Sequence, residues 1–478
     1  MPFLQDSPLG GTLKKWLIGA ALACGPLLST PEAQASEFAS LRVSLLANDD
    51  DLTSSGFASV LHLGLRLRSP ELGPGLRAEA EVSLLLSSSN SGDLSFRDNA
   101  SFLRLVWRPE SWGETEGLSL TVLPLTSTRL HLGYEQPATW GRGVYAVSSS
   151  RSGIVGAPGL EARLTREHGY AFTAAKSVVG INSQTGEPER LAMVMAGAGV
   201  DVWPLVRLEA AGAFVQHGVI ESLANLGREE RASTGAVSGR VLFHQGAPIG
   251  PSVDFSLYQQ DPEVFEKLFA PEEYPGGVSA SVSLEATALS QTLMDPDVDE
   301  GAVRSQGAEA VALQARLKVD FLRVHALALH RSATFISSEV PGFPPFKAYP
   351  QDTGLRSELL LSAGADYHFA GPALTPGLVV RAVWPAAFDN TRLVGIPDAM
   401  PRFVLLRGPA EFTALRPGRE RQPILLAKAT LRWDFGSAFS AMGEAFYTQD
   451  PNRGVNEDDD TGTPASTLGF SALLQARF

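Results

Sequence analysis

The feature that most constrains this chain is a strict period-two alternation of apolar and polar residues. Four stretches show it plainly, at residues 61–68, 77–86, 278–288 and 311–319. Successive side chains of a β-strand point to opposite faces, so each stretch predicts a strand with one apolar and one polar face. Many such stretches approach the length of about 9 to 11 residues that a tilted strand needs to cross a bilayer.

Composition excludes two other classes of protein. No run of about 18 apolar residues, the length that a spanning helix requires, follows residue 35. The mean hydropathy is +0.02, an intermediate value that two alternating strand faces would give. The chain carries 39 basic and 52 acidic residues, a net charge of −13, and so lacks the basic excess with which nucleic-acid-binding proteins neutralise phosphates. We expect no nucleic-acid partner.

The first 35 residues predict a secretory signal peptide. Two lysines precede an apolar stretch at 16–28, and an Ala-x-Ala cleavage signature ends the segment at 33–35. The alternative is a lipoprotein signal acylated at Cys24, but the preceding leucine stands one place too late for that pattern. Because Cys24 is the only cysteine, no intramolecular disulfide can form. The predicted division is a signal peptide at 1–35 and a transmembrane β-barrel at 36–478.

Short and long connections between the predicted strands differ in a regular way. Tight turns are predicted near Pro204, near Asp320 and at 435–437. Long polar connections are predicted at 48–56, 87–100, 136–158, 337–354, 386–401 and 450–464. Short periplasmic turns and long extracellular loops are typical of outer-membrane barrels. Residues 260–277 and 291–307 both look like long loops with one strand between them, so either one is an unusually long periplasmic turn or a strand is hidden.

The last strand carries the sharpest motif. Apolar residues take every second place to the end of the chain, at Leu468, Phe470, Ala472, Leu474, Ala476 and Phe478. This stretch of about ten residues resembles the C-terminal recognition strand of bacterial outer-membrane β-barrels, porin-like proteins among them. Phe470, Leu474 and Phe478 are the assembly-signal candidates.

The resemblance implies an all-β fold, a closed antiparallel transmembrane β-barrel of about 16–18 strands. The expected location is the outer membrane of a Gram-negative bacterium. Outer-membrane lipid, lipopolysaccharide and the barrel assembly machinery are the expected partners. A soluble periplasmic sandwich would also alternate and stays open as the alternative.

Tryptophans stand where alternating stretches end. Trp107, Trp203, Trp384 and Trp433 all occupy such places. Amphipathic indoles prefer the level of the lipid headgroups, so we interpret these four as girdle residues. The alternative is that they cap a soluble core.

Basic residues predominate on the polar strand faces, which would line the lumen of a barrel. The lumen and selectivity candidates are Arg66, Arg68, Arg104, Arg108, Arg129, Arg142, Arg240, Arg316, Lys318 and Arg432. Rings of arginine and lysine favour anions, although pairing with glutamates on neighbouring strands is an equally good explanation. The segment 136–158, with Trp140, Arg142, Tyr145 and Arg151, is the candidate for a loop that narrows the lumen; the alternative is an ordinary surface loop.

The sequence offers weak candidates for metal chemistry and none for catalysis. Two acidic loops, at 295–301 and 456–462, place oxygen side chains at positions 1, 3 and 5, as calcium-binding loops do. Calcium-binding loops need glycine at position 6, but in both of these loops glycine stands at position 7. These candidates are Asp295, Asp297, Asp299, Asp458 and Asp460. The alternative is that the loops are merely solvated. The eight histidines lack metal-ligand spacing and no catalytic motif occurs, so we expect neither an enzyme nor a cofactor.

These observations lead to two functional hypotheses. The first is an outer-membrane porin-like channel for small solutes, with anionic solutes as the specific hypothesis. The second is a barrel that anchors or forms the conduit of a trans-envelope complex for secretion, surface motility or polysaccharide export, with periplasmic envelope proteins as partners. The alanine-rich, aromatic-poor strands favour the second hypothesis.

Overall fold

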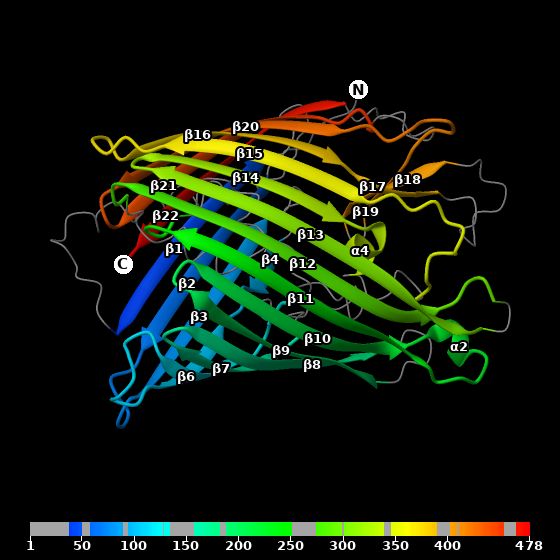
Figure 1. Cartoon of the computed structure of the whole chain (residues 1–478), viewed down its shortest axis with the longest axis horizontal. Helices are drawn as coiled ribbons and strands as arrows, with labels where there is room; N and C mark the ends of the chain where they lie inside the picture. Colours follow the sequence, from blue (N-terminus) through cyan, green and yellow to red (C-terminus); the bar gives the residue numbers. More distant parts are fainter. Residues whose placement is uncertain are drawn as a thin grey trace, which may run out of the picture.

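A computed structural model gives the fold of this chain (Figure 1). The structure describes residues 38–49, 58–88, 94–127, 129–133, 157–181, 188–250, 274–298, 301–338, 346–389, 402–408, 411–453 and 465–478. The predicted signal peptide and its cleavage site lie outside these residues.

Nineteen of the described strands form one antiparallel sheet. They are β1 (Ala39–Asp49), β2 (Ala58–Arg68), β3 (Leu76–Ser88), β4 (Leu94–Asp98), β5 (Phe102–Trp107), β6 (Gly117–Leu123), β7 (Gly159–Arg166), β8 (Gly169–Ile181), β9 (Pro188–Trp203), β10 (Val206–Val219), β11 (Arg231–Gln245), β12 (Val278–Met294), β13 (Val303–Val319), β14 (Leu322–Arg331), β15 (Glu358–Tyr367), β16 (Leu374–Trp384), β20 (Ile424–Phe435), β21 (Phe439–Gln449) and β22 (Ser466–Arg477).

The sheet closes on itself, because β1 pairs with both β2 and β22. The last residue takes part, since Leu41 and Phe478 exchange two backbone hydrogen bonds of 2.9 Å. β4 and β5 pair with successive parts of β3 and together fill one position in the wall, so the barrel has 19 − 1 = 18 positions. The predicted closed antiparallel barrel of 16–18 strands is confirmed.

The two ends of the barrel differ as the sequence predicts. One end, here the short-turn end, holds tight connections such as Asp320–Phe321 between β13 and β14. Asp320 adopts a left-handed φ of 50°, which aspartate tolerates in such turns. The opposite end, here the loop end, holds the long connections (Figure 1). β11 and β12 pair directly, so the long connection between them lies at the short-turn end and no further strand stands between them in the described wall.

Three predicted loops are partly strand. Residues 94–98 of the predicted loop 87–100 form β4, and residues 386–389 of the predicted loop 386–401 form a short strand. β12 runs to Met294 and β13 begins at Val303, so most of the predicted loop 291–307 is strand. At 291–307, polar residues on both faces of the loop ends of β12 and β13 misled the prediction.

Small elements gather at the loop end. They are α2 (Glu221–Ala224), α4 (Ala333–Ser338) and a three-stranded sheet of β17 (Ala386–Asp389), β18 (Phe403–Gly408) and β19 (Glu411–Ala414). Ala333 and Ile336 of α4 pack with Phe388 and Leu406 of this sheet in one buried apolar cluster. No helix in the described part of the chain is long and apolar enough to cross a membrane.

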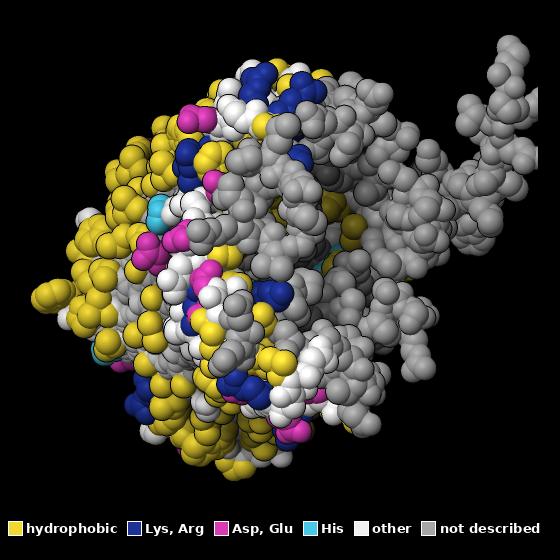
Figure 2. Space-filling view, turned by 90° about the vertical axis from the view of Figure 1, so that its right-hand side faces the viewer, with side chains coloured by type: hydrophobic (Ala, Val, Ile, Leu, Met, Phe, Trp, Pro, Cys, Tyr) yellow, Lys and Arg dark blue, Asp and Glu magenta, His cyan; other side chains and the backbone are white. Residues whose placement is uncertain are grey.

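The barrel wall is apolar outside and polar inside. On β12, Leu284 faces outward and is 50% exposed, whereas the neighbouring Glu285 faces inward and is 1% exposed. Arg432 and Lys318 are among the largest fully buried side chains. Soluble proteins bury their apolar residues and expose their charges. The reversed arrangement excludes the soluble sandwich, and Figure 2 shows the apolar flank beside a charged rim at the loop end.

The four predicted girdle tryptophans all lie on the outer face. Trp107, Trp203 and Trp433 stand near the short-turn end, where they are 45%, 69% and 46% exposed. Trp384 stands at the loop end of β16 and is half-buried. The tryptophans thus lie near both rims of the apolar wall, the levels at which amphipathic aromatic side chains meet lipid headgroups.

Candidate functional site

Inward-facing charges of β1, β2, β3 and β5 form an arginine cluster. Arg42 of β1 lies 2.5 Å from Glu81 of β3, and Arg129 lies 3.9 Å from the same carboxylate. Arg66, Arg68 and Arg104 lie 2.9, 3.6 and 3.9 Å from Glu79. Five arginines therefore lie around two glutamates, and the carboxylate of Glu161 on β7 also acts on Arg104.

Strand register brings these side chains together. Arg66 pairs with Glu81 and Arg68 with Glu79 across β2 and β3, while Arg104 faces Glu79 across β3 and β5. Gly64 stands beside Arg42 in the β1–β2 pair, and a Cβ there would lie 3.4 Å from the Arg42 guanidinium. The absence of a side chain at Gly64 leaves room for Arg42 to reach across β2 to Glu81.

An aromatic ring helps to hold the arginine cluster. Phe102 of β5 is buried, and the guanidinium carbons of Arg66, Arg104 and Arg129 lie 5.8, 4.7 and 5.3 Å from its ring centroid. The face of an aromatic ring attracts cations. Phe102 therefore offsets part of the repulsion between the guanidinium groups and keeps them close together.

The connection between β6 and β7 enters the barrel. Thr126 donates a hydrogen bond of 2.6 Å to Asp98, and Lys176 of β8 donates one of 2.9 Å to the Leu130 carbonyl. Leu130 and Ala157 are buried in an apolar cluster with inward-facing residues of β5, β6, β8, β9 and β10. Both described flanks of the predicted constriction 136–158 thus lie inside the lumen. Trp140, Arg142, Tyr145 and Arg151 lie outside the described residues.

Two of the predicted lumen arginines do not lie on the wall. Arg129 belongs to the β6–β7 connection and reaches the arginine cluster from inside the lumen, donating a 3.3 Å hydrogen bond to the Ala100 carbonyl. Arg108 lies in the turn after β5 and donates to the Glu114 carbonyl at 3.0 Å. Sequence reasoning missed Arg42, although the alternation in residues 39–47 points to it.

Other basic residues lie beside acidic partners. Arg240 contacts Glu209, Arg323 lies 2.6 Å from Asp366, and Arg432 lies 2.9 Å from Asp434. Cross-strand pairing, the alternative that the sequence left open, describes the first two pairs, whereas Arg432 and Asp434 stand on the same strand, β20. Arg316 also faces the interior of the barrel from β13. The arginine cluster differs because its cations outnumber its carboxylates.

A second group of side chains makes contact inside the barrel at the short-turn end. Tyr274, from the β11–β12 connection, stacks on His368 at 3.9 Å and lies 5.6 Å from the Lys318 ammonium. Its hydroxyl and the His368 ring both contact Thr375 Oγ1, at 3.3 and 2.9 Å. Burial raises the pKa of Tyr274 to about 12 and lowers the pKa of His368. Both rings are therefore neutral at pH 7.

In one predicted calcium loop, an arginine side chain lies beside the acidic residues. Arg304 lies 3.1 Å from Asp295 and 2.6 Å from Asp297. The described residues hold no group of three or more side chains suited to a metal ion. Asp299, Asp458 and Asp460 lie outside them.

A closed barrel with an apolar outer wall, a charged interior and a connection folded into its lumen has the architecture of membrane channels. No protein-family model and no curated protein sequence matches the chain.

Solved structures with a similar arrangement of strands include three bacterial proteins. OccAB1 of Acinetobacter baumannii is 9% identical, with a TM-score of 0.49 and coverage of 94% of this chain and 99% of that one. OccK5 (OpdH) of Pseudomonas aeruginosa is 10% identical, with a TM-score of 0.48 and coverage of 92% and 97%. The outer membrane protein OpdK of the same species, solved with vanillate, is 8% identical, with a TM-score of 0.47 and coverage of 92% and 98%. The barrel itself rests on its own strand pairing.

Proposed function

We propose that this protein is an outer-membrane channel of a Gram-negative bacterium that passes small anionic solutes. The observation that supports the proposal most is the arginine cluster, in which five arginines share two glutamates inside the lumen. Excess fixed positive charge lowers the entry barrier for anions and raises it for cations. Guanidinium groups also suit carboxylates and phosphates, because their planar donors match two oxygens at once.

The β6–β7 connection supports the proposal because it brings the solute path close to the cluster. Arg129 lies on this connection and packs beside the wall arginines, against Glu81 and the Phe102 ring. A solute that passes the cluster therefore meets positive charge from the wall and from the connection. Low-dielectric walls strengthen that attraction relative to bulk water.

Reversal potentials in a salt gradient test the proposed anion selectivity. We expect the purified protein to favour anions in planar bilayers and the double variant Arg66→Glu/Arg104→Glu to shift the potential toward cations. The matched control is Arg166→Glu/Arg190→Glu, which changes the total charge equally at exposed positions outside the cluster.

An unchanged potential in the Arg66/Arg104 variant would contradict anion selection by the cluster. A protein that inserts into bilayers but opens no pore would contradict the proposed channel function. Co-purification of a non-conducting barrel with periplasmic proteins would favour the anchor or conduit of a trans-envelope complex instead.

A further inference from the structure

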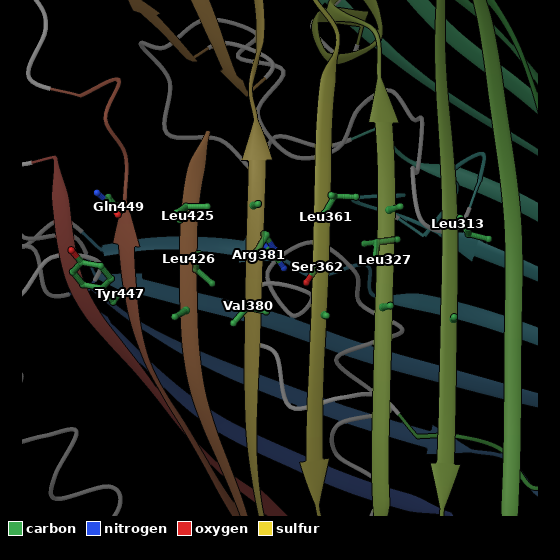
Figure 3. A pocket seen from close by; sticks show the side chains of 16 residues that line it. Leu313, Leu327, Leu361, Ser362, Val380, Arg381, Leu425, Leu426, Tyr447 and Gln449 are labelled. Carbon is green, nitrogen blue, oxygen red and sulfur yellow. The ribbon is translucent and has the colours of Figure 1, made fainter. Parts of the chain in front are cut away.

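The outer wall of the barrel has a hollow that the channel function does not use. Its volume is about 700 Å³, and it lies across β13–β16, β20 and β21. Its floor is one row of outward-facing residues in strand register, Ala315, Ala326, Ala363, Val380, Ala427 and Tyr447. We call this hollow the wall groove; Figure 3 shows it from outside the barrel.

Larger side chains form one edge of the wall groove. Leu313, Leu361 and Leu425 stand in the adjacent register row, each 42% to 47% exposed. That row ends at the exposed Gln449. The groove is thus apolar along its length, with the Tyr447 hydroxyl and the Gln449 amide at its end on β21.

The path of the groove fits one leaflet of a bilayer. Five spacings between six strands give a length of about 24 Å. The strands run obliquely to the barrel axis (Figure 1), so the two ends of the row lie at different depths. Tyr447 stands two residues from the loop end of β21, and Ala315 stands four residues from the short-turn end of β13. At a strand tilt of about 45° the descent is about 17 Å, close to the ~15 Å depth of one leaflet. Trp384, one outward row beyond Leu361 and Leu425 toward the loop end, marks the interfacial level.

Positive charge lies beyond the upper end of the groove. Gln422 and Asn452 exchange hydrogen bonds of 2.8 and 2.9 Å just past Leu425 and Gln449, which joins the connections that follow β19 and β21. Arg416 and Arg419 are exposed on the first connection, and Arg453, which lies 3.4 Å from Asp450, has a side chain 39% exposed on the second. We call these three residues the rim arginines.

We infer that the wall groove binds an acyl chain of a phosphorylated glycolipid, lipopolysaccharide, with its phosphates at the rim arginines. Apolar lining alone would suit any lipid tail or a second protein. The phosphate preference comes from charge complementarity, because guanidinium groups pair with phosphate oxygens. Because most of the floor residues are alanines, the acyl chain can sink into the wall groove instead of lying on the surface of the wall. More of the acyl chain's surface is then buried.

Native mass spectrometry of the full chain in detergent tests this inference, with purified bisphosphorylated lipid A as the probe. The titration contains EDTA, so that metal ions cannot bridge lipid to the acidic residues at 457–460, which lie outside the described residues. We expect one lipid A per barrel. Ala363→Phe/Ala427→Phe, which fills the groove, should weaken binding about ten-fold.

Three controls keep the inference falsifiable. Ala210→Phe on β10 places a phenylalanine at an exposed outward alanine away from the groove and should change nothing. Arg416→Glu/Arg419→Glu should weaken binding of lipid A but not of phosphatidylethanolamine. Channel conductance should be unchanged in all these variants, so failure here leaves the proposed channel untouched.

Equal weakening by Ala210→Phe, or equal affinity for phosphatidylethanolamine or phosphatidylglycerol, would overturn the inference. A barrel that forms dimers which Ala363→Phe/Ala427→Phe dissociates would assign the groove to a second copy of the chain instead.

Discussion

Individual charges inside the barrel wall depend on close partners of opposite charge. Arg323 and Asp366 lie 2.6 Å apart with side chains 4% and 3% exposed. Removing one member of a buried ion pair leaves an uncompensated charge and costs about 3 to 5 kcal/mol. We expect Arg323→Met to lower the free energy of unfolding by about that amount in urea titrations followed by gel mobility. The double variant Arg323→Met/Asp366→Leu should recover most of it; equal loss in both variants would contradict this pairing.

The contact between Tyr274 and His368 predicts a local pH dependence at the short-turn end. Burial lowers the pKa of His368 below its ordinary value of 6.5, and nearby Asp434 and Asp366 oppose this while Arg323 and Arg432 add to it. The neutral ring is therefore favoured in the folded state. Its stabilisation is complete above pH 6.5 and is lost as the pH falls from 6.5 toward the folded pKa.

Histidine NMR titration measures this pKa directly. We expect His368 to titrate below pH 6.5 in the wild-type barrel. In Tyr274→Ala the pKa should move back toward 6.5, because the ring that covers the imidazole is gone. A pKa that Tyr274→Ala leaves unchanged would show that the tyrosine does not cause the shift.

Among the strands, β22 shows most directly how the sequence closes the barrel, because it pairs with β1. Phe478 bonds to Leu41 through both backbone groups, and its ring lies 6.0 Å from that of Phe439. Deleting Phe478 removes the two backbone hydrogen bonds that join the first and last strands nearest the short-turn end. We expect less heat-modifiable, folded barrel in outer-membrane fractions, whereas Phe478→Trp should assemble normally. Normal assembly after the deletion would contradict an assembly role for the terminal residue.

Elements with strict alternation could be predicted from sequence, and elements defined by long-range contacts could not. Residues 278–288 and 311–319 predict the cores of β12 and β13 because period two is a local property. The break between β4 and β5 falls at Ala100, whose φ is 58°, and only pairing with β3 makes the two strands one wall position. In the candidate site, Arg66 and Arg104 follow from alternation. Arg129 reaches the cluster through a fold of the connection that no local pattern encodes.

For the whole molecule, the interior charge predicts how anion selectivity responds to salt. The arginine cluster acts on a passing ion through space, and salt screens such interactions over about 10 Å at 0.1 M but about 3 Å at 1 M. We expect the anion-to-cation permeability ratio to fall as both bathing solutions are raised from 0.1 to 1 M KCl at a fixed gradient ratio. Arg66→Glu/Arg104→Glu should reverse the preference at 0.1 M and converge with the wild type at 1 M. A ratio independent of salt would mean that pore shape, rather than these fixed charges, selects the ion.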